Sequence, residues 1–196
     1  MERQSQQTSI DRIALEPEPT STGQRLMSSP DGAVTLMLSD IADAESLEQT
    51  VGAERWEQLL REWQGLVDEV VRGYAGDVGK FDRDGFFASF NSAHAGLHAA
   101  VELQRACNEL ALDGRDVCPR VGVHSGFVIP NPDQPQGRNM VLAARIAAQA
   151  GAGEILVSSS LKDYTERDRR FRFEERGEYH FKGLVGEHTV YSVAWT

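Results

Sequence analysis

Apolar and polar positions along the chain repeat with two periods, which together predict an ordered series of strands and helices. A short, almost continuous apolar run over 34–41 predicts a strand covered on both faces, at the centre of a sheet. Amphipathic helical spacing is found over 53–73, 92–112 and 137–151, with shorter helical stretches over 42–52 and 159–165. The remaining strands are expected over 78–90, as a hairpin that turns at Asp84-Gly85, and over 120–129, 154–158, 171–181 and 188–195.

This order, β-α-β-β-α-β-α-β followed by a C-terminal pair of strands, predicts an α+β fold. Its core would be a ferredoxin-like βαββαβ unit with additional C-terminal strands. In that topology the first strand lies beside the hairpin, so Asp40 and Asp84 can meet at one end of the sheet. Two simpler interpretations stay open at this point: Asp40 caps the next helix, and Asp84 belongs to a solvated turn.

The first 30 residues have a different composition from the rest of the chain. They are polar and are interrupted by Pro17, Pro19 and Pro30, which predicts a flexible N-terminal arm over 1–30 ahead of a single domain over 31–196. Residues 13–15 of this arm, Ile-Ala-Leu, could make an apolar contact, for which a partner subunit is one candidate.

Charge and composition narrow the classes of partner. The net charge is −10, from 20 basic and 30 acidic residues, which argues against nucleic acid or an anionic membrane surface as the main partner. A small anion held together with a metal ion stays compatible with this charge. The chain has no apolar run of membrane-spanning length and no apolar core of a signal peptide. Cys107 and Cys118 lack metal-ligand spacing, so we expect a cytoplasmic protein with reduced thiols.

Six short segments, taken together, resemble the class III nucleotidyl cyclases, that is, the adenylate and guanylate cyclase catalytic domain. The resemblance extends from about Gly32 to Val193 and rests on the common order and spacing of the segments. They are VTLMLSDI (34–41), KFDRDGF (80–86), RVGVHSG (120–126), NMVLAARIA (139–147), GEILVS (153–158) and KGLVGEHTVY (182–191).

The resemblance implies a homodimeric enzyme with two active sites at the subunit interface. Each site would hold two Mg²⁺ or Mn²⁺ ions through Asp40, the backbone carbonyl of Ile41 and Asp84, and hard oxygen ligands suit these ions. The implied reaction converts a nucleoside triphosphate, with ATP as the first candidate, to the 3′,5′-cyclic nucleotide and pyrophosphate. The enzyme would then be an adenylate cyclase-type phosphorus–oxygen lyase.

The resemblance also assigns roles in substrate binding and catalysis. Lys80 stands where the family reads the purine edge, and its partner in base selection would be Asp133 or Gln134. Arg145 stands where the partner subunit supplies an arginine that stabilises charge on the phosphate, and Asn139 fits a variant position of the accompanying asparagine. Without the resemblance, Lys80 would be a surface lysine and Arg145 a helix-surface arginine paired with an acid.

Several positions depart from the family pattern. Asp43 and Glu45 stand where small residues usually surround the triphosphate, and Val141 replaces the usual asparagine. Arg83 replaces a glycine and could either compete with the metal or bind phosphate itself. The alternative function is therefore a catalytically degenerate cyclase-homology domain that acts as a nucleotide-binding, dimerisation or regulatory module. The sequence leaves the base preference and the regulatory input open.

Overall fold

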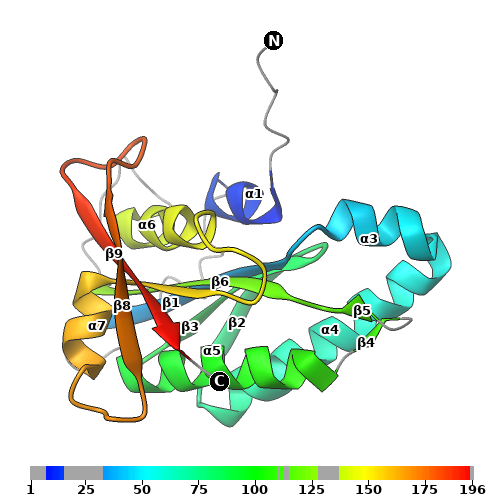
Figure 1. Cartoon of the computed structure of the whole chain (residues 1–196), viewed down its shortest axis with the longest axis horizontal. Coiled ribbons are helices and arrows are strands. Elements are labelled where there is room, and N and C mark those ends of the chain that lie inside the picture. Colours follow the sequence, from blue (N-terminus) through cyan, green and yellow to red (C-terminus); the bar gives the residue numbers. More distant parts are fainter. Residues whose placement is uncertain (1–7, 16–32, 110, 113–114, 128–136, 195–196) are drawn as a thin grey trace.

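A computed structural model describes residues 8–15, 33–109, 111–112, 115–127 and 137–194 of the chain (Figure 1). The helices are α1 (Ser9–Leu15), α3 (Ala44–Val51), α4 (Ala53–Gly73), α5 (Ala93–Glu109), α6 (Arg138–Ala147) and α7 (Ser159–Thr165). The strands are β1 (Ala33–Ile41), β2 (Asp77–Asp82), β3 (Gly85–Phe90), β4 (Ala111–Leu112), β5 (Arg115–Asp116), β6 (Pro119–Phe127), β7 (Ile155–Ser158), β8 (Arg172–Tyr179) and β9 (His188–Ala194). None of the helices among these residues is long and apolar enough to cross a membrane.

One seven-stranded sheet organises the fold, in the order β2-β3-β1-β6-β7-β9-β8. The central strand β1 pairs antiparallel with β3 on one side and with β6 on the other, and β6 pairs parallel with β7. Strands β2, β3, β1 and β6 form the ferredoxin-like core, and β7, β9 and β8 extend it. This arrangement confirms the predicted α+β fold and the predicted neighbourhood of the first strand and the hairpin.

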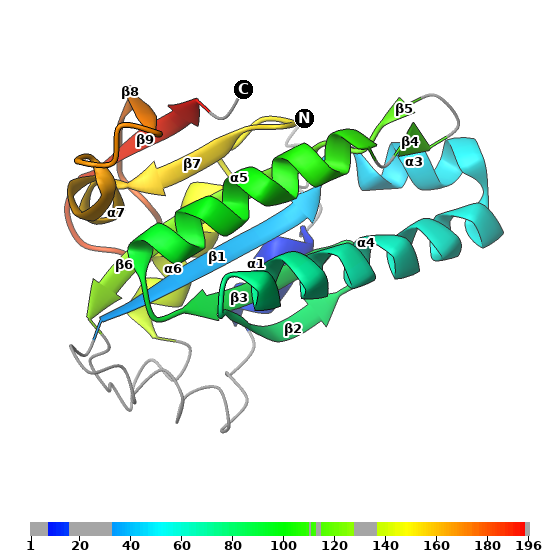
Figure 2. The same cartoon turned by 90° about the horizontal axis from the view of Figure 1, so that it is seen from below.

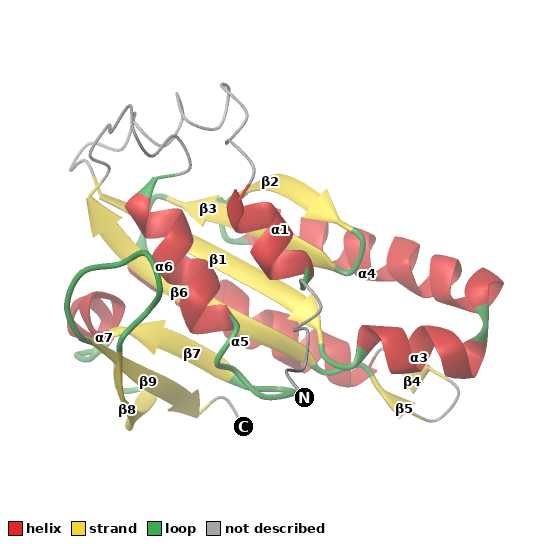
Figure 3. Cartoon of the chain, turned by 90° about the horizontal axis from the view of Figure 1, so that it is seen from above, coloured by secondary structure: helices red, strands yellow, loops and turns green. Residues whose placement is uncertain are grey.

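Helices cover both faces of the sheet. Figure 2 shows α4 and α5 crossing one face, and Figure 3 shows α6 and α1 on the other. Side chains alternate between the faces along β1, so Met37 and Ile41 join the core beneath α4 and α5, whereas Leu36 and Leu38 join the core beneath α6 and α1. By the same alternation, Asp40 lies on the face that α6 and α1 cover.

The backbone of helix α6 contacts the sheet directly at Gly122 of β6. A Cβ atom at Gly122 would lie 2.3 Å from the backbone nitrogen of Ala147, so a larger residue would force α6 outward. The helix in turn carries Arg145 on the face of the sheet that also holds Asp40.

Both edge strands are irregular. β2 pairs with β3 through a register shift between Val78 and Lys80, and β8 pairs with β9 through a register shift between Glu175 and Gly177. β8 also exposes a series of charged side chains to solvent, namely Arg172, Glu174, Glu175, Arg176 and Glu178.

The end of α5, the strand pair β4–β5 and helix α1 differ from what the sequence predicts. The helix predicted over 92–112 ends at Glu109, and Ala111–Leu112 pairs instead with Arg115–Asp116, in keeping with the turn-forming Asp-Gly dipeptide between them in the sequence. Within the predicted arm, residues 8–15 are described, and Ser9–Leu15 forms helix α1.

The rest of the arm, 1–7 and 16–30, lies outside the described residues, so the division at residue 30 stays a prediction. Neither cysteine forms a disulfide; Cys107 is buried and Cys118 is half-buried.

Candidate active site

Asp40 is a buried carboxylate at the C-terminal end of β1. It is 1% exposed and lies opposite Arg120 in the β1–β6 register. The two side chains share a face and form a bidentate ion pair, in which Nε donates to Oδ1 at 2.8 Å and Nη2 donates to Oδ2 at 2.5 Å. Burial raises the pKa of Asp40 to about 6, Arg120 opposes this shift, and the negative charge of Asp84 adds to it.

Asp84 reaches the same region from the turn between β2 and β3. It is 8% exposed, and its backbone carbonyl accepts a hydrogen bond from Nε1 of Trp63 at 3.0 Å, which fixes the turn against α4. Arg83, next to it, has a positive φ of 55° and turns outward to donate to Glu48 of α3 at 2.9 Å. The turn therefore presents Asp84 inward and Arg83 toward the rim.

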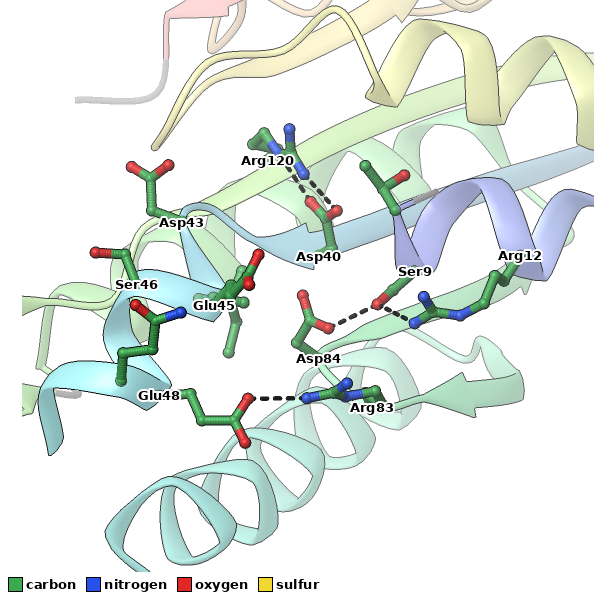
Figure 4. A pocket seen from close by; sticks show the side chains of 14 residues that line it. Ser9, Arg12, Asp40, Asp43, Glu45, Ser46, Glu48, Arg83, Asp84 and Arg120 are labelled. Carbon is green, nitrogen blue, oxygen red and sulfur yellow. Dashed lines mark hydrogen bonds and ion pairs between the residues drawn. The ribbon is translucent and has the colours of Figure 1, made fainter. Parts of the chain in front are cut away.

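A pocket of about 900 Å³ collects these groups (Figure 4). Asp40, Ile41 and Asp84 all line it, as the sequence predicts for a shared site at one end of the sheet. The side chain of Ile41 belongs to the core beneath α4, which leaves its backbone as the part that can meet a ligand. The full lining is Thr8, Ser9, Arg12, Asp40, Ile41, Asp43, Ala44, Glu45, Ser46, Glu48, Gln49, Arg83, Asp84 and Arg120.

The donor set suits a hard divalent cation. Two buried carboxylates, Asp40 and Asp84, and the backbone of Ile41 line the pocket, and Mg²⁺ is typically bound by one or two carboxylates together with substrate phosphates and water. Nowhere in the described ranges do three or more His, Cys, Asp or Glu residues gather into a metal-binding group, so a metal here would depend on such additional ligands. Asp43 and Glu45, the acidic departures from the family pattern, are exposed residues of the pocket lining.

Lys80 and Arg145 lie outside this lining. Lys80 sits on edge strand β2, opposite Phe87. Asp133 and Gln134 lie outside the described residues. Arg145, on α6, donates from Nη1 to Oδ1 of Asp11 in α1 at 3.0 Å. Their roles in substrate binding and catalysis, including the assignment of Arg145 to a partner subunit, stay predictions.

Asn139 is held inward by its own chain. Its Nδ2 donates to the backbone carbonyl of Phe127 at 2.8 Å, and its Oδ1 lies 3.2 Å from Nε2 of His124. Nδ1 of His124 lies 2.9 Å from Oγ of Ser158, so the buried ring links β6, α6 and the end of β7. The catalytic role of Asn139 likewise stays a prediction.

Sequence reasoning missed Arg120 and the polar residues of α1, of which Ser9 and Arg12 line the pocket and Asp11 contacts Arg145. Arg120 opens the quoted segment at 120–126, and pairing of that strand with the first one would have placed it opposite Asp40. Ser9, Asp11 and Arg12 carry no such signal. The spacing of Ile10 and Ile13 is the only helical hint near them, because the surrounding segment is short and polar.

The ion pair predicts a large loss of stability in Arg120→Ala. The variant leaves the Asp40 carboxylate buried without its partner, so the free energy of unfolding should fall by about 3 kcal/mol near pH 8. The loss should shrink toward pH 5, because protonated Asp40 no longer needs the guanidinium. Urea unfolding measures both values. Arg72→Ala removes an exposed ion pair with Asp68 and should change the stability by less than about 1 kcal/mol.

The burial of His124 predicts a second dependence of the free energy of unfolding on pH. Burial lowers the pKa of His124 from 6.5 to about 4, so the unfolded chain binds this proton first and stability is lost as pH falls through that window. The raised pKa of Asp40 has the opposite effect, because it adds stability as pH falls from about pH 6 to about pH 4. The test therefore compares the variant with the unchanged protein at each pH. Between pH 7 and pH 4, His124→Gln should gain about 3 kcal/mol of stability relative to the unchanged protein. A pH-independent difference in urea unfolding would contradict this.

The fold and the acidic pocket define an α+β domain with a candidate cation site at the end of its central strands. Residues 26–194 match the family described as the adenylate and guanylate cyclase catalytic domain. The chain belongs to this family.

Two curated proteins are similar to this chain over part of its length. Putative adenylate cyclase 3 of Rhizobium meliloti is 27% identical over 141 residues, which are 70% of this chain and 24% of the relative. An uncharacterized protein of Mycobacterium tuberculosis is 27% identical over 136 residues, which are 68% of this chain and 45% of the relative. The chain thus spans less than half the length of these relatives.

Solved structures share the fold at low sequence identity. The adenylyl cyclase CyaB from P. aeruginosa aligns with a TM-score of 0.72 and 20% identity, over 83% of this chain and 93% of that one. The catalytic core of a rhodopsin-guanylyl cyclase with converted specificity, in complex with ATPalphaS, aligns with a TM-score of 0.73 and 18% identity, over 83% and 96%. At this level of identity the likeness establishes the fold.

Proposed function

We propose that the protein is a metal-dependent nucleotidyl cyclase, with ATP as the first candidate substrate. One observation carries the proposal: Asp40 and Asp84, which come from separate elements, are both buried and line one pocket at the end of the sheet. Folding does not require two inward carboxylates there. Arg120 pairs with Asp40, whereas Asp84 accepts its hydrogen bond from the uncharged hydroxyl of Ser9. A bound cation would therefore offset the buried charge of Asp84. Family membership supplies the reaction class.

The chain's own groups would divide the work at a homodimer interface. Asp40, the carbonyl of Ile41 and Asp84 would hold two Mg²⁺ or Mn²⁺ ions. When bound, these ions lower the pKa of the ribose 3′-hydroxyl and neutralise the triphosphate. Arg120 places a guanidinium in the same pocket, where it can donate to phosphate oxygens. In the reaction, the 3′-oxygen forms a bond to the α-phosphorus, pyrophosphate leaves, and the hydroxyl proton is released to solvent.

The remaining roles concern the base and the partner subunit. Lys80, with Asp133 or Gln134, would contact the base, and Arg145 of the opposite protomer would stabilise charge on the phosphate, with Asn139 beside it. Arg83, at the rim of the pocket, would meet the outer phosphates if it left Glu48. In this set of roles a second copy of the chain supplies Arg145, which does not line the pocket of its own protomer.

A second candidate function has its own observation. Both carboxylates proposed to bind metal already have protein partners, since Asp40 is paired with Arg120 and Asp84 accepts a hydrogen bond from Ser9. A domain that no longer binds metal could retain such contacts permanently and serve as a dimerisation or nucleotide-binding module.

Pyrophosphate release from ATP, GTP, CTP and UTP, each with Mn²⁺ and with Mg²⁺, tests the proposal. We expect release from one purine nucleotide, with a cyclic product by mass spectrometry. A folded dimer that binds nucleotide but releases no pyrophosphate under any of these conditions would favour the module instead.

A further inference from the structure

Helix α1 lies over the candidate site and contacts its acidic hairpin. Oγ of Ser9 donates to Oδ1 of Asp84 at 2.6 Å, and Nε of Arg12 donates to Oδ2 of Asp82 at 2.6 Å. Arg12 also donates to Oγ of Ser9 at 2.9 Å, as Figure 4 shows beside the contact of Ser9 with Asp84. Ser9 and Arg12 therefore join both acidic residues of the hairpin in one network. A proposed metal ligand is thus occupied by a segment more than 70 residues away in the chain.

The same helix engages the residue assigned to the opposite half of the composite site. Oδ1 of Asp11 accepts a hydrogen bond from Nη1 of Arg145 at 3.0 Å. Under the proposed function, Asp84 serves the pocket of its own protomer and Arg145 serves the pocket of the partner. One turn of α1 therefore binds both residues: Ser9 holds Asp84, which serves the protomer's own pocket, and Asp11 holds Arg145, which serves the partner's pocket.

Two apolar side chains anchor α1 in this position. Ile10 and Ile13 are buried, at 0% and 3% exposure, in the cluster that β1, β3 and α6 form on this face. α1 has seven residues, and an isolated helix of this length is unstable in water, so its helical form depends on docking.

The backbone beneath α1 leaves room for its approach. A Cβ atom at Gly85 would lie 2.6 Å from Cβ of Ser9, whereas its contacts with Ile13 and with the carbonyl of Ser39 would be an acceptable 3.4 Å. The φ of Gly85 is not positive, so alanine fits the backbone there. A single methyl group at this position would therefore act mainly on α1.

We propose that α1 is an inhibitory segment of this chain, bound over the candidate site, and that metal and the second protomer engage fully only when α1 is displaced. The inference rests on the proposed function for what the site does. The occlusion of Asp84 and Arg145 is a separate property that can be measured by itself. Under this inference the hydrogen bond between Ser9 and Asp84 is reversible. In a degenerate domain the same contact would be permanent.

The test is to detach α1 in the full-length chain with Ile10→Asn and Ile13→Asn together. Both changes remove the apolar anchor and leave every polar contact residue and the net charge unchanged. Hydrogen exchange of α1 amides reports release, electron paramagnetic resonance of free Mn²⁺ reports metal affinity, and pyrophosphate release reports activity. We expect faster exchange in α1 and about tenfold tighter Mn²⁺ binding, because the binding-competent state is no longer a minor fraction. Activity should rise by a similar factor.

Two further variants complete the design. Gly85→Ala should shift all three measurements in the same direction by pushing Ser9 away. Val185→Asn is the matched control, since it replaces an 86% exposed apolar residue outside the pocket lining and should change nothing. If the double variant fails to fold by circular dichroism, Ser9→Ala with Arg12→Ala, which keeps the isoleucines, should still tighten Mn²⁺ binding several-fold.

The outcomes separate the inference from the proposed function. Unchanged Mn²⁺ affinity and unchanged activity in a variant whose α1 has been released would overturn the inhibitory role. Tighter Mn²⁺ binding without turnover of any nucleotide would support occlusion by α1 and reject the cyclase proposal. Turnover that is equal with α1 docked and released would support the cyclase and reject the inhibition.

Discussion

Asp84→Asn is expected to lower pyrophosphate release by about 10³-fold, the equivalent of about 4 kcal/mol in the activation barrier. Asparagine has nearly the same shape, and its amide oxygen can still accept the hydrogen bond from Ser9. The fold should therefore persist while the negative charge that binds the cation is lost. Steady-state kinetics with saturating Mn²⁺, together with Mn²⁺ binding, measure the effect.

The control for this variant is Asp68→Asn, which removes a carboxylate that is paired with Arg72 on α4 and lies outside the pocket lining. Its activity should match that of the unchanged protein. Activity of Asp84→Asn within tenfold of that value would show that Asp84 does not hold an essential ion.

Mixing two inactive variants should restore activity if each site is shared between protomers. Arg145→Ala and Asp84→Asn are each expected to be inactive as homodimers. Random association of equal amounts makes half of the dimers mixed, and each mixed dimer has one site with both residues intact. The mixture should therefore recover about a quarter of the full activity, as the two-fold symmetry of a dimer requires.

This experiment also tests the assignment of Arg145 directly. If Arg145 acted within its own protomer, every site in the mixture would lack one of the two residues, and no activity would return. Sedimentation of the mixture confirms that dimers have formed, and mixing Arg145→Ala with itself supplies the baseline.

The central elements of the fold could be predicted because their signals are local and strong. The apolar run that became β1 and the Asp-Gly turn of the hairpin fix two neighbouring strands, and their pairing brings Asp40 and Asp84 to one pocket. The ferredoxin-like order follows from the alternation of these strands with long amphipathic helices.

Arg120 and α1 could not be recognised as easily, because their importance depends on long-range pairing. Arg120 acquires its role from the β1–β6 register, 80 residues away from Asp40 in the chain. α1 is short, and its two isoleucines mean little until the surface that receives them is known. The acidic partner expected for a helix-surface arginine was found for Arg145, but it is Asp11, from the segment predicted to be a flexible arm.

The irregular pairing of the two edge strands limits how copies of this chain can associate. β2 and β8 end the sheet, both are interrupted by register shifts, and β8 carries a row of charges. Such edges resist the addition of a further strand, so neighbouring molecules are discouraged from joining their sheets into open-ended stacks. Crowded or partly unfolded preparations should therefore form few fibrillar aggregates through these edges, and ordered assembly is directed to the helices that cover the faces of the sheet.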